Sequence, residues 1–134
     1  MSSNKNELDP LDALIASPNH HRLLMENDKV RVVETLIPPG ERTTIHTHQW
    51  AGVLHVMSWS HFVRRDDKDN ILVDSRTVEA LKNPAKVRWG AALAPHSLDH
   101  VGGQTLRIVA VEWKESRFRP PRKSNTGAHI DAPL

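Results

Sequence analysis

The chain has 134 residues, which suits one hydrophobic core and argues against two full domains. It contains no cysteine, so disulfide scaffolds, thiolate zinc sites and iron–sulfur clusters are excluded, and no apolar run reaches the 18 residues of a membrane span. The 18 Lys and Arg residues exceed the 16 Asp and Glu residues by only two, and six aromatic residues offer few stacking platforms, so we expect no nucleic-acid partner. The N-terminus lacks the basic start and apolar stretch of a secretory signal, so we expect a cytoplasmic protein.

Residues 1–29 are polar and are interrupted by Pro10 and Pro18. Asp9 is placed to cap a short helix that has Pro10 at its first position. We therefore predict an N-terminal arm over residues 1–29, in contrast to the β-rich sequence that follows it.

Residues 30–37 contain six β-favouring side chains and end at Pro38, Pro39 and Gly40, which predicts a buried strand and a turn. Further strands are expected over residues 42–48, 53–57, 59–64, 71–73, 87–93 and 105–113. A polar loop at 66–70 should close a hairpin, residues 77–83 should form one or two helical turns, and turns are expected at Pro95 and at residues 102–103. Short strands at this spacing, with little helix, predict an all-β sandwich or barrel over residues 30–113.

Residues 114–134 are polar and rich in arginine, without apolar periodicity. This pattern predicts a basic tail that is solvated or packs on a neighbour, with an anion-binding arm as the alternative.

Nine histidines make imidazole the natural ligand for any metal ion in this chain. His46 and His48 are two residues apart on a short β segment, so both side chains leave the same face of the strand. Such a pair can bind one metal ion, or it can face solvent.

The segments PGERTTIHTH and APHSLDHVGG resemble the two sequence motifs of the cupin family. Gly40, His46 and His48 match the first motif, in which five residues separate a glycine from His-x-His. The second motif often reads Pro-His-Ser, which is the sequence of residues 95–97 here. The resemblance covers residues 30–113, and it implies a double-stranded β-helix, or jelly-roll barrel, with a divalent metal ion held by His46, His48 and His96.

The sequence departs from the cupin motifs at several positions. Gly52 occupies the position where the family has a ligand glutamate. Trp59 replaces the glycine that ends the first motif. His100 replaces the asparagine of the second motif, and Ala85, Ala91 and Leu93 replace its Gly, Pro and Gly. The pattern thus resembles the three-histidine cupins, which include the cysteine dioxygenases and the diketone-cleaving dioxygenases.

Other residues near the motifs have two interpretations each. His100 is either a fourth ligand or a partner that fixes the tautomer of a ligand. Glu34 and Glu112 each lie in an apolar strand, and either replaces the missing carboxylate or pairs with an arginine such as Arg31 or Arg107.

The remaining candidates have no motif that favours a role in the site. Trp50 and Trp89 either wall a pocket or belong to the core. His55 has the opposite strand parity to residue 52, which places it outside the site or at a subunit contact. The other histidines are expected to lie on the surface or to be satisfied by ordinary partners: His20, His21, His61 and His129.

The resemblance implies a metal-dependent enzyme, similar to a dioxygenase, that acts on a small chelating acid or diketone. The expected cofactor is one divalent ion, Fe, Zn, Mn or Ni, with Fe favoured. The alternative is a non-catalytic cupin that binds a small anion or a sugar. Because small cupins resemble proteins that exchange terminal strands, we expect a homodimer.

Overall fold

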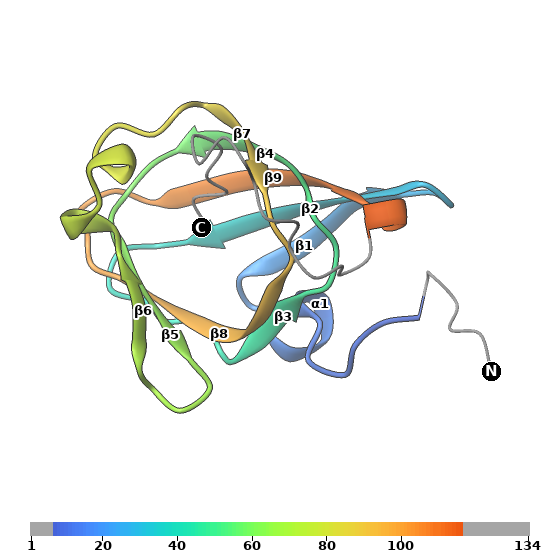
Figure 1. Ribbon diagram of the computed structural model, residues 1–134, viewed down its shortest axis with the longest axis horizontal. Coiled ribbons are helices and arrows are strands. Elements are labelled where there is room, and N and C mark those ends of the chain that lie inside the picture. Colours follow the sequence, from blue (N-terminus) through green and yellow to red (C-terminus); the bar gives the residue numbers. More distant parts are fainter. Residues whose placement is uncertain (1–6, 117–134) are drawn as a thin grey trace, which may run out of the picture.

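The computed structural model describes residues 7–116, and two antiparallel sheets account for about half of them (Figure 1). One sheet has the order β1 (His21–Glu26), β2 (Val30–Ile37), β9 (Leu106–Trp113), β4 (Gly52–Ser58) and β7 (Val87–Gly90). The other has the order β3 (His46–His48), β8 (Leu93–His100), β5 (Phe62–Asp66) and β6 (Ile71–Asp74). The helical segments are short: α1 (Ala13–Ala16), η1 (Ser75–Thr77), η2 (Glu79–Leu81) and η3 (Lys114–Ser116). The predicted all-β jelly-roll architecture is confirmed.

The hydrophobic core lies between the two sheets. Ile37 and Ile108 reach it from the five-stranded sheet, Phe62 and Leu98 reach it from the four-stranded sheet, and Leu81 of η2 covers one end. This core fills one end of the barrel, and the histidines lie toward the other.

The central pairing joins segments that are far apart in sequence. β2 pairs with β9 over eight residue pairs, from Val30 with Trp113 to Ile37 with Leu106. Alternation along β2 places Arg31, Val33 and Ile37 in buried positions, as expected for a strand with one face on a core.

Most of the predicted strands are present, and the helical turns expected over residues 77–83 correspond to η1 and η2. The turn predicted at Pro95 is wrong, because Pro95 lies inside β8. The pairing of β8 with β3 shifts by one residue at that point, between the pairs His46–His96 and His48–Leu93. Such irregularities accommodate a proline, which has no backbone N–H to donate.

The N-terminal segment is more ordered than its polar sequence indicates. Residues 21–26 form β1, which pairs with β2 at one edge of the larger sheet. The helix predicted to be capped by Asp9 starts later, because the Asp12 carboxylate accepts the Leu14 N–H and caps α1. The tail predicted over residues 114–134 lies outside the described residues beyond Ser116.

None of the helices in residues 7–116 is long and apolar enough to cross a membrane.

Candidate metal centre

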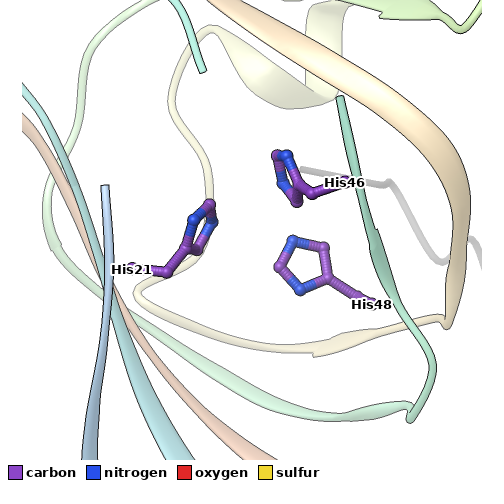
Figure 2. A group of neighbouring side chains, drawn as sticks. All are labelled: His21, His46 and His48. Atoms are coloured by element: carbon purple, nitrogen blue, oxygen red, sulfur yellow. The ribbon is translucent and has the colours of Figure 1, made fainter. Parts of the chain in front are cut away.

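Four histidine rings meet inside the barrel between the two sheets. His46 and His48 come from β3, His96 from β8, and His21 from β1 in the opposite sheet. The ring centroid of His46 lies 4.5 Å from that of His21, 5.0 Å from that of His48 and 4.4 Å from that of His96. Each of His21, His46 and His48 offers one ring nitrogen within 4.8 Å of the others, and Figure 2 shows His21 facing the other two rings.

Three of these rings are held in the orientation that a metal ligand requires. The Nδ1–H groups of His21, His46 and His96 donate to the carbonyl oxygens of Ser17, Thr44 and Ala94 at 2.9, 2.7 and 2.8 Å. A carbonyl only accepts, so the proton must sit on Nδ1 and the lone pair on Nε2. The three Nε2 atoms are buried and have no hydrogen-bond partner among residues 7–116.

Burial and mutual repulsion keep all four imidazoles neutral at ordinary pH. Burial first, and neighbouring histidines second, lower the pKa of His48 to about 3 and that of His96 to about 2. Burial also lowers the pKa of His46, and it lowers that of His21 well below its ordinary value. Neutral imidazole is the form that binds a metal ion, so the site is prepared for a cation without releasing protons.

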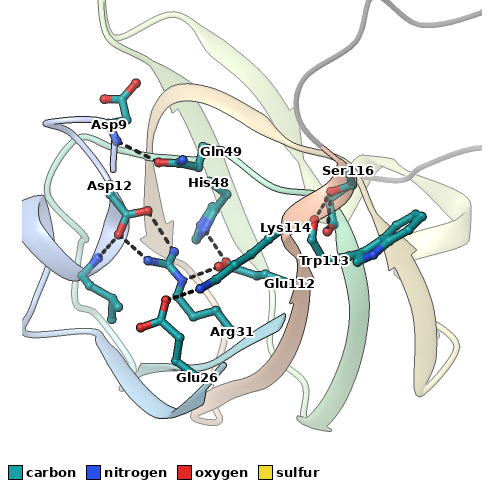
Figure 3. A network of polar contacts seen from close by, with 12 residues as sticks. Asp9, Asp12, Glu26, Arg31, His48, Gln49, Glu112, Trp113, Lys114 and Ser116 are labelled. Atoms are coloured by element: carbon teal, nitrogen blue, oxygen red, sulfur yellow. Dashed lines mark hydrogen bonds and ion pairs between the residues drawn. The ribbon is translucent and has the colours of Figure 1, made fainter. Parts of the chain in front are cut away.

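A buried ion-pair network supports the centre from one side (Figure 3). Arg31, which is 1% exposed, donates from both terminal nitrogens to Asp12 at 3.0 and 2.9 Å and from Nε to Glu112 at 2.7 Å. The other carboxylate oxygen of Glu112 lies 3.8 Å from His48 Nδ1. Glu112 is therefore held by Arg31, as one of its two interpretations required, and it also borders the site.

The structure explains why no carboxylate stands at position 52. A side chain at Gly52 would place its Cβ 2.0 Å from the Val111 carbonyl oxygen on the neighbouring strand, closer than atoms can approach. Gly52 also pairs with Gly90 across β4 and β7, so two adjacent positions carry no side chain. They border a cavity of about 60 Å³ that reaches His21 and His48.

The three histidines predicted as ligands lie in one cluster of rings, and His21 belongs to it as well, although the ring nitrogens within 4.8 Å of one another are those of His21, His46 and His48. His21 was expected on the surface or with ordinary partners, but its Nε2 is buried in the cluster without a partner. The sequence carries no motif at His21, which reaches the site at the end of the β1–β2 hairpin, where it lies opposite Thr35.

His100, the predicted tautomer-fixing residue, lies in a different environment. Its Nε2 contacts the carbonyl oxygen of Gln104, and its ring is buried near the end of β8. The tautomer of His96 is set by Ala94 instead.

Glu34 and His55 fall into the simpler of their two interpretations, Trp50 falls into the pocket interpretation, and Trp89 fits neither of its two. Glu34 is paired with Arg22 at 3.0 Å and with Arg107 at 2.8 Å. Trp89 is 37% exposed, whereas Trp50 is buried and lines the cavity, as the pocket interpretation required. His55 is exposed.

His20 and His61 have ordinary polar partners. The Nε2 of His20 lies 2.9 Å from a Glu41 carboxylate oxygen, and the Nδ1 of His61 lies 2.8 Å from the Ser75 hydroxyl. His129 lies outside the described residues.

Comparison with solved structures identifies the fold. A cupin domain from Bordetella pertussis Tohama I matches with a TM-score of 0.51 and 17% identity, over 69% of this chain and 90% of its own. The polyketide cyclase RemF from Streptomyces resistomycificus has a TM-score of 0.44 and 22% identity, over 75% of this chain and 66% of its own. An RmlC-like cupin protein from Desulfovibrio desulfuricans has a TM-score of 0.43 and 15% identity, over 83% of this chain and 96% of its own. No protein-family model matches the sequence, and no curated protein matches it.

The chain therefore has the cupin fold, with a cluster of histidines between its two sheets.

Proposed function

We propose that this chain is a metal-binding cupin in which His21, His46, His48 and His96 together hold one divalent transition-metal ion. The observation that carries the proposal is the set of three buried Nε2 lone pairs, on His21, His46 and His96, that have no hydrogen-bond partner. Burying a polar atom without a partner costs roughly 1–3 kcal/mol, so three in one cluster call for a common ligand. In this assignment His21 supplies the fourth ligand that Gly52 does not.

The protein contributes orientation and charge to such a site. Backbone carbonyls fix three of the four rings, so metal binding requires little rearrangement. Four neutral nitrogens leave the ion its full charge, and the Glu112 carboxylate next to His48 is the nearest compensating group. When bound, the ion would act as a Lewis acid toward a chelating ligand, and Fe(II) could also supply electrons to oxygen, which is why we place it ahead of Zn, Mn and Ni.

The proposed activity is a dioxygenase-like reaction on a small chelating acid or diketone. Such compounds bind a metal ion through two oxygens and become more acidic when they do so. Oxygen uptake by the metal-loaded protein with a panel of these compounds supports an enzyme, whereas tight binding without uptake supports the non-catalytic alternative.

Metal content tests the site directly. Protein purified without a histidine tag should carry about one divalent ion per chain, and His21→Ala and His46→Ala should each weaken binding by at least about 100-fold, since even loss of an outer-shell partner costs 10- to 100-fold. Elemental analysis and competition with a chelating dye measure both quantities.

The exposed His55 provides the matched control, and His55→Ala should retain the metal of the unmodified protein. A metal-free protein, or a His46→Ala variant that retains its metal, would overturn the proposal. Loss of metal from His46→Ala but not from His21→Ala would restrict the site to the three motif histidines.

The proposal includes a homodimer formed through the outer face of the larger sheet. A row of directly paired apolar residues crosses all five strands on this face: Met25, Val32, Val111, Val53 and Trp89. Four of the five are exposed, and exposed apolar belts of this kind are typical of protein–protein interfaces.

Light scattering should therefore give twice the chain mass of 15.1 kDa, and Val53→Lys should shift the protein to the mass of one chain. A lysine in the centre of the belt would have to be buried without a partner, which disfavours association. Ile71→Lys, at an exposed position on the other sheet, should leave the dimer intact. A monomeric unmodified protein would contradict this part of the proposal.

A further inference from the structure

The cavity beside the histidines has one polar end and apolar walls. Its polar lining residues are His21, Thr35, His48 and Glu112. Apolar side chains from β4, β8 and β9 form the walls: Leu54, Leu93, Leu98, Leu106, Ile108 and Ala110. A ligand bound at the histidines would therefore contact apolar side chains of β4, β8 and β9.

The cavity is bordered by backbone where β4 and β7 pair. Gly52 lies opposite Gly90, and Ala91 follows, so this stretch of wall is mostly backbone. A Cβ at Gly90 would lie 2.8 Å from the Leu54 side chain, so an alanine at this position would displace Leu54. The glycine at the position of the motif carboxylate thus borders the space available to a ligand.

Charge and polarity limit what the apolar part of the cavity can accept. Among the described residues that line it, none is a lysine or an arginine, and the Glu112 carboxylate at its polar end is negative and held by Arg31. A second anionic group on the ligand would be buried without a cation, and sugar hydroxyls would meet hydrocarbon. Both would be disfavoured.

We infer that the ligand carries a short, uncharged alkyl group next to its chelating end, and that this group occupies the cavity along Leu54, Leu106 and Ile108. An apolar cavity of about 150 Å³ binds benzene, so the 60 Å³ here suits a group of about two to four carbons. The inference rests on the proposed metal site, because the ion would anchor the chelating end.

Alkyl hydroxamic acids test the inference, since they chelate a metal ion through two oxygens and differ only in chain length. With the zinc-loaded protein, calorimetry should show affinity rising about fourfold per methylene, which is about 0.8 kcal/mol, and then levelling off after two to four carbons. A hydroxamic acid of equal length that ends in a carboxylate should bind at least about 10-fold more weakly than the methyl-ended compound, because that charge is buried without a cation.

Two variants should move the optimum in opposite directions. Gly90→Ala places a methyl group against Leu54 and should shorten the best-binding chain, whereas Leu54→Ala widens the cavity and should lengthen it. Met57→Ala, at an exposed position on the same strand, should leave the series unchanged.

The outcomes separate this inference from the metal site itself. If the protein binds zinc but affinity does not depend on chain length, or the carboxylate-ended compound binds best, the inference is overturned and the metal site stands. If the protein binds no metal, both are overturned.

Discussion

Asp12→Ala should lower the free energy of unfolding by about 3–5 kcal/mol, the usual cost of removing one partner from a buried ion pair. Asp12 and Arg31 are 0% and 1% exposed, and both carboxylate oxygens accept from the guanidinium. Without Asp12, Arg31 would keep Glu112 as its carboxylate partner in this network, and part of a buried positive charge would be uncompensated. Urea unfolding of the metal-free protein measures the loss.

The same substitution should weaken metal binding, because α1 is connected to two of the histidine-bearing strands. Asp12 caps α1, and the Ser17 carbonyl just after this helix orients His21. The Leu11 carbonyl accepts the N–H of Thr47, the residue between His46 and His48. A less ordered α1 would release both restraints, so the ligands would have to be ordered at the expense of binding energy.

Asp9→Ala is the matched control, since Asp9 is exposed and its carboxylate accepts only the nearby Leu11 N–H among the hydrogen bonds of the described residues. We expect it to change stability by less than about 1 kcal/mol. Asp12→Asn preserves the shape of the side chain and should give an intermediate loss. An Asp12→Ala variant as stable as the Asp9→Ala variant would show that the network is not a major source of stability.

The three motif histidines could be predicted because their placement depends on local rules. Strand alternation puts His46 and His48 on one face, and the spacing of the second motif identifies His96. Their convergence needs only the pairing of β3 with β8, which the cupin resemblance implies.

His21 could not be predicted in the same way. Its strand follows a polar segment, and its position depends on pairing with β2 and on the Ser17 carbonyl behind its ring. Burial of the Arg31–Asp12 pair, which ties α1 to the sheet, is equally a property of the folded chain. The polar sequence of residues 1–29 therefore gives no sign that β1 supplies His21, one of the four clustered rings.

Gly52 shows a different limit of the sequence. The motif reveals that a carboxylate is missing but gives no reason for it. The structure supplies one, because the strand carrying Gly52 lies too close to the Val111 carbonyl for any side chain. The replacement of the motif glutamate by Gly52 thus follows from the close pairing of β4 with β9. Gly52 also lines the cavity that reaches His21, the histidine from β1.

Lowering the pH from 8 to 5 should destabilise the metal-free protein, and the buried histidines give the sign of this effect. In the unfolded chain these histidines take up protons as the pH falls through about 6.5, whereas burial holds the folded pKa of His48 near 3 and that of His96 near 2. The unfolded state therefore binds more protons between these limits, and stability is complete above pH 6.5 and declines below it. Each such histidine should contribute roughly 1 kcal/mol per pH unit, while Glu112, whose pKa is raised by burial, acts weakly in the opposite sense.

Urea unfolding at pH 8, 7, 6 and 5, on protein stripped of metal, measures this dependence above the range in which most carboxylates titrate. His96→Asn removes one of the titrating groups and should flatten the profile below pH 6.5 by about one proton, which is the slope that a single linked site contributes. His55→Asn, at an exposed position, should reproduce the slope of the unmodified protein. A free energy of unfolding that stays constant from pH 8 to 5 would show that the cluster accepts protons in the folded state, and so that its rings are less shielded from water than their burial indicates.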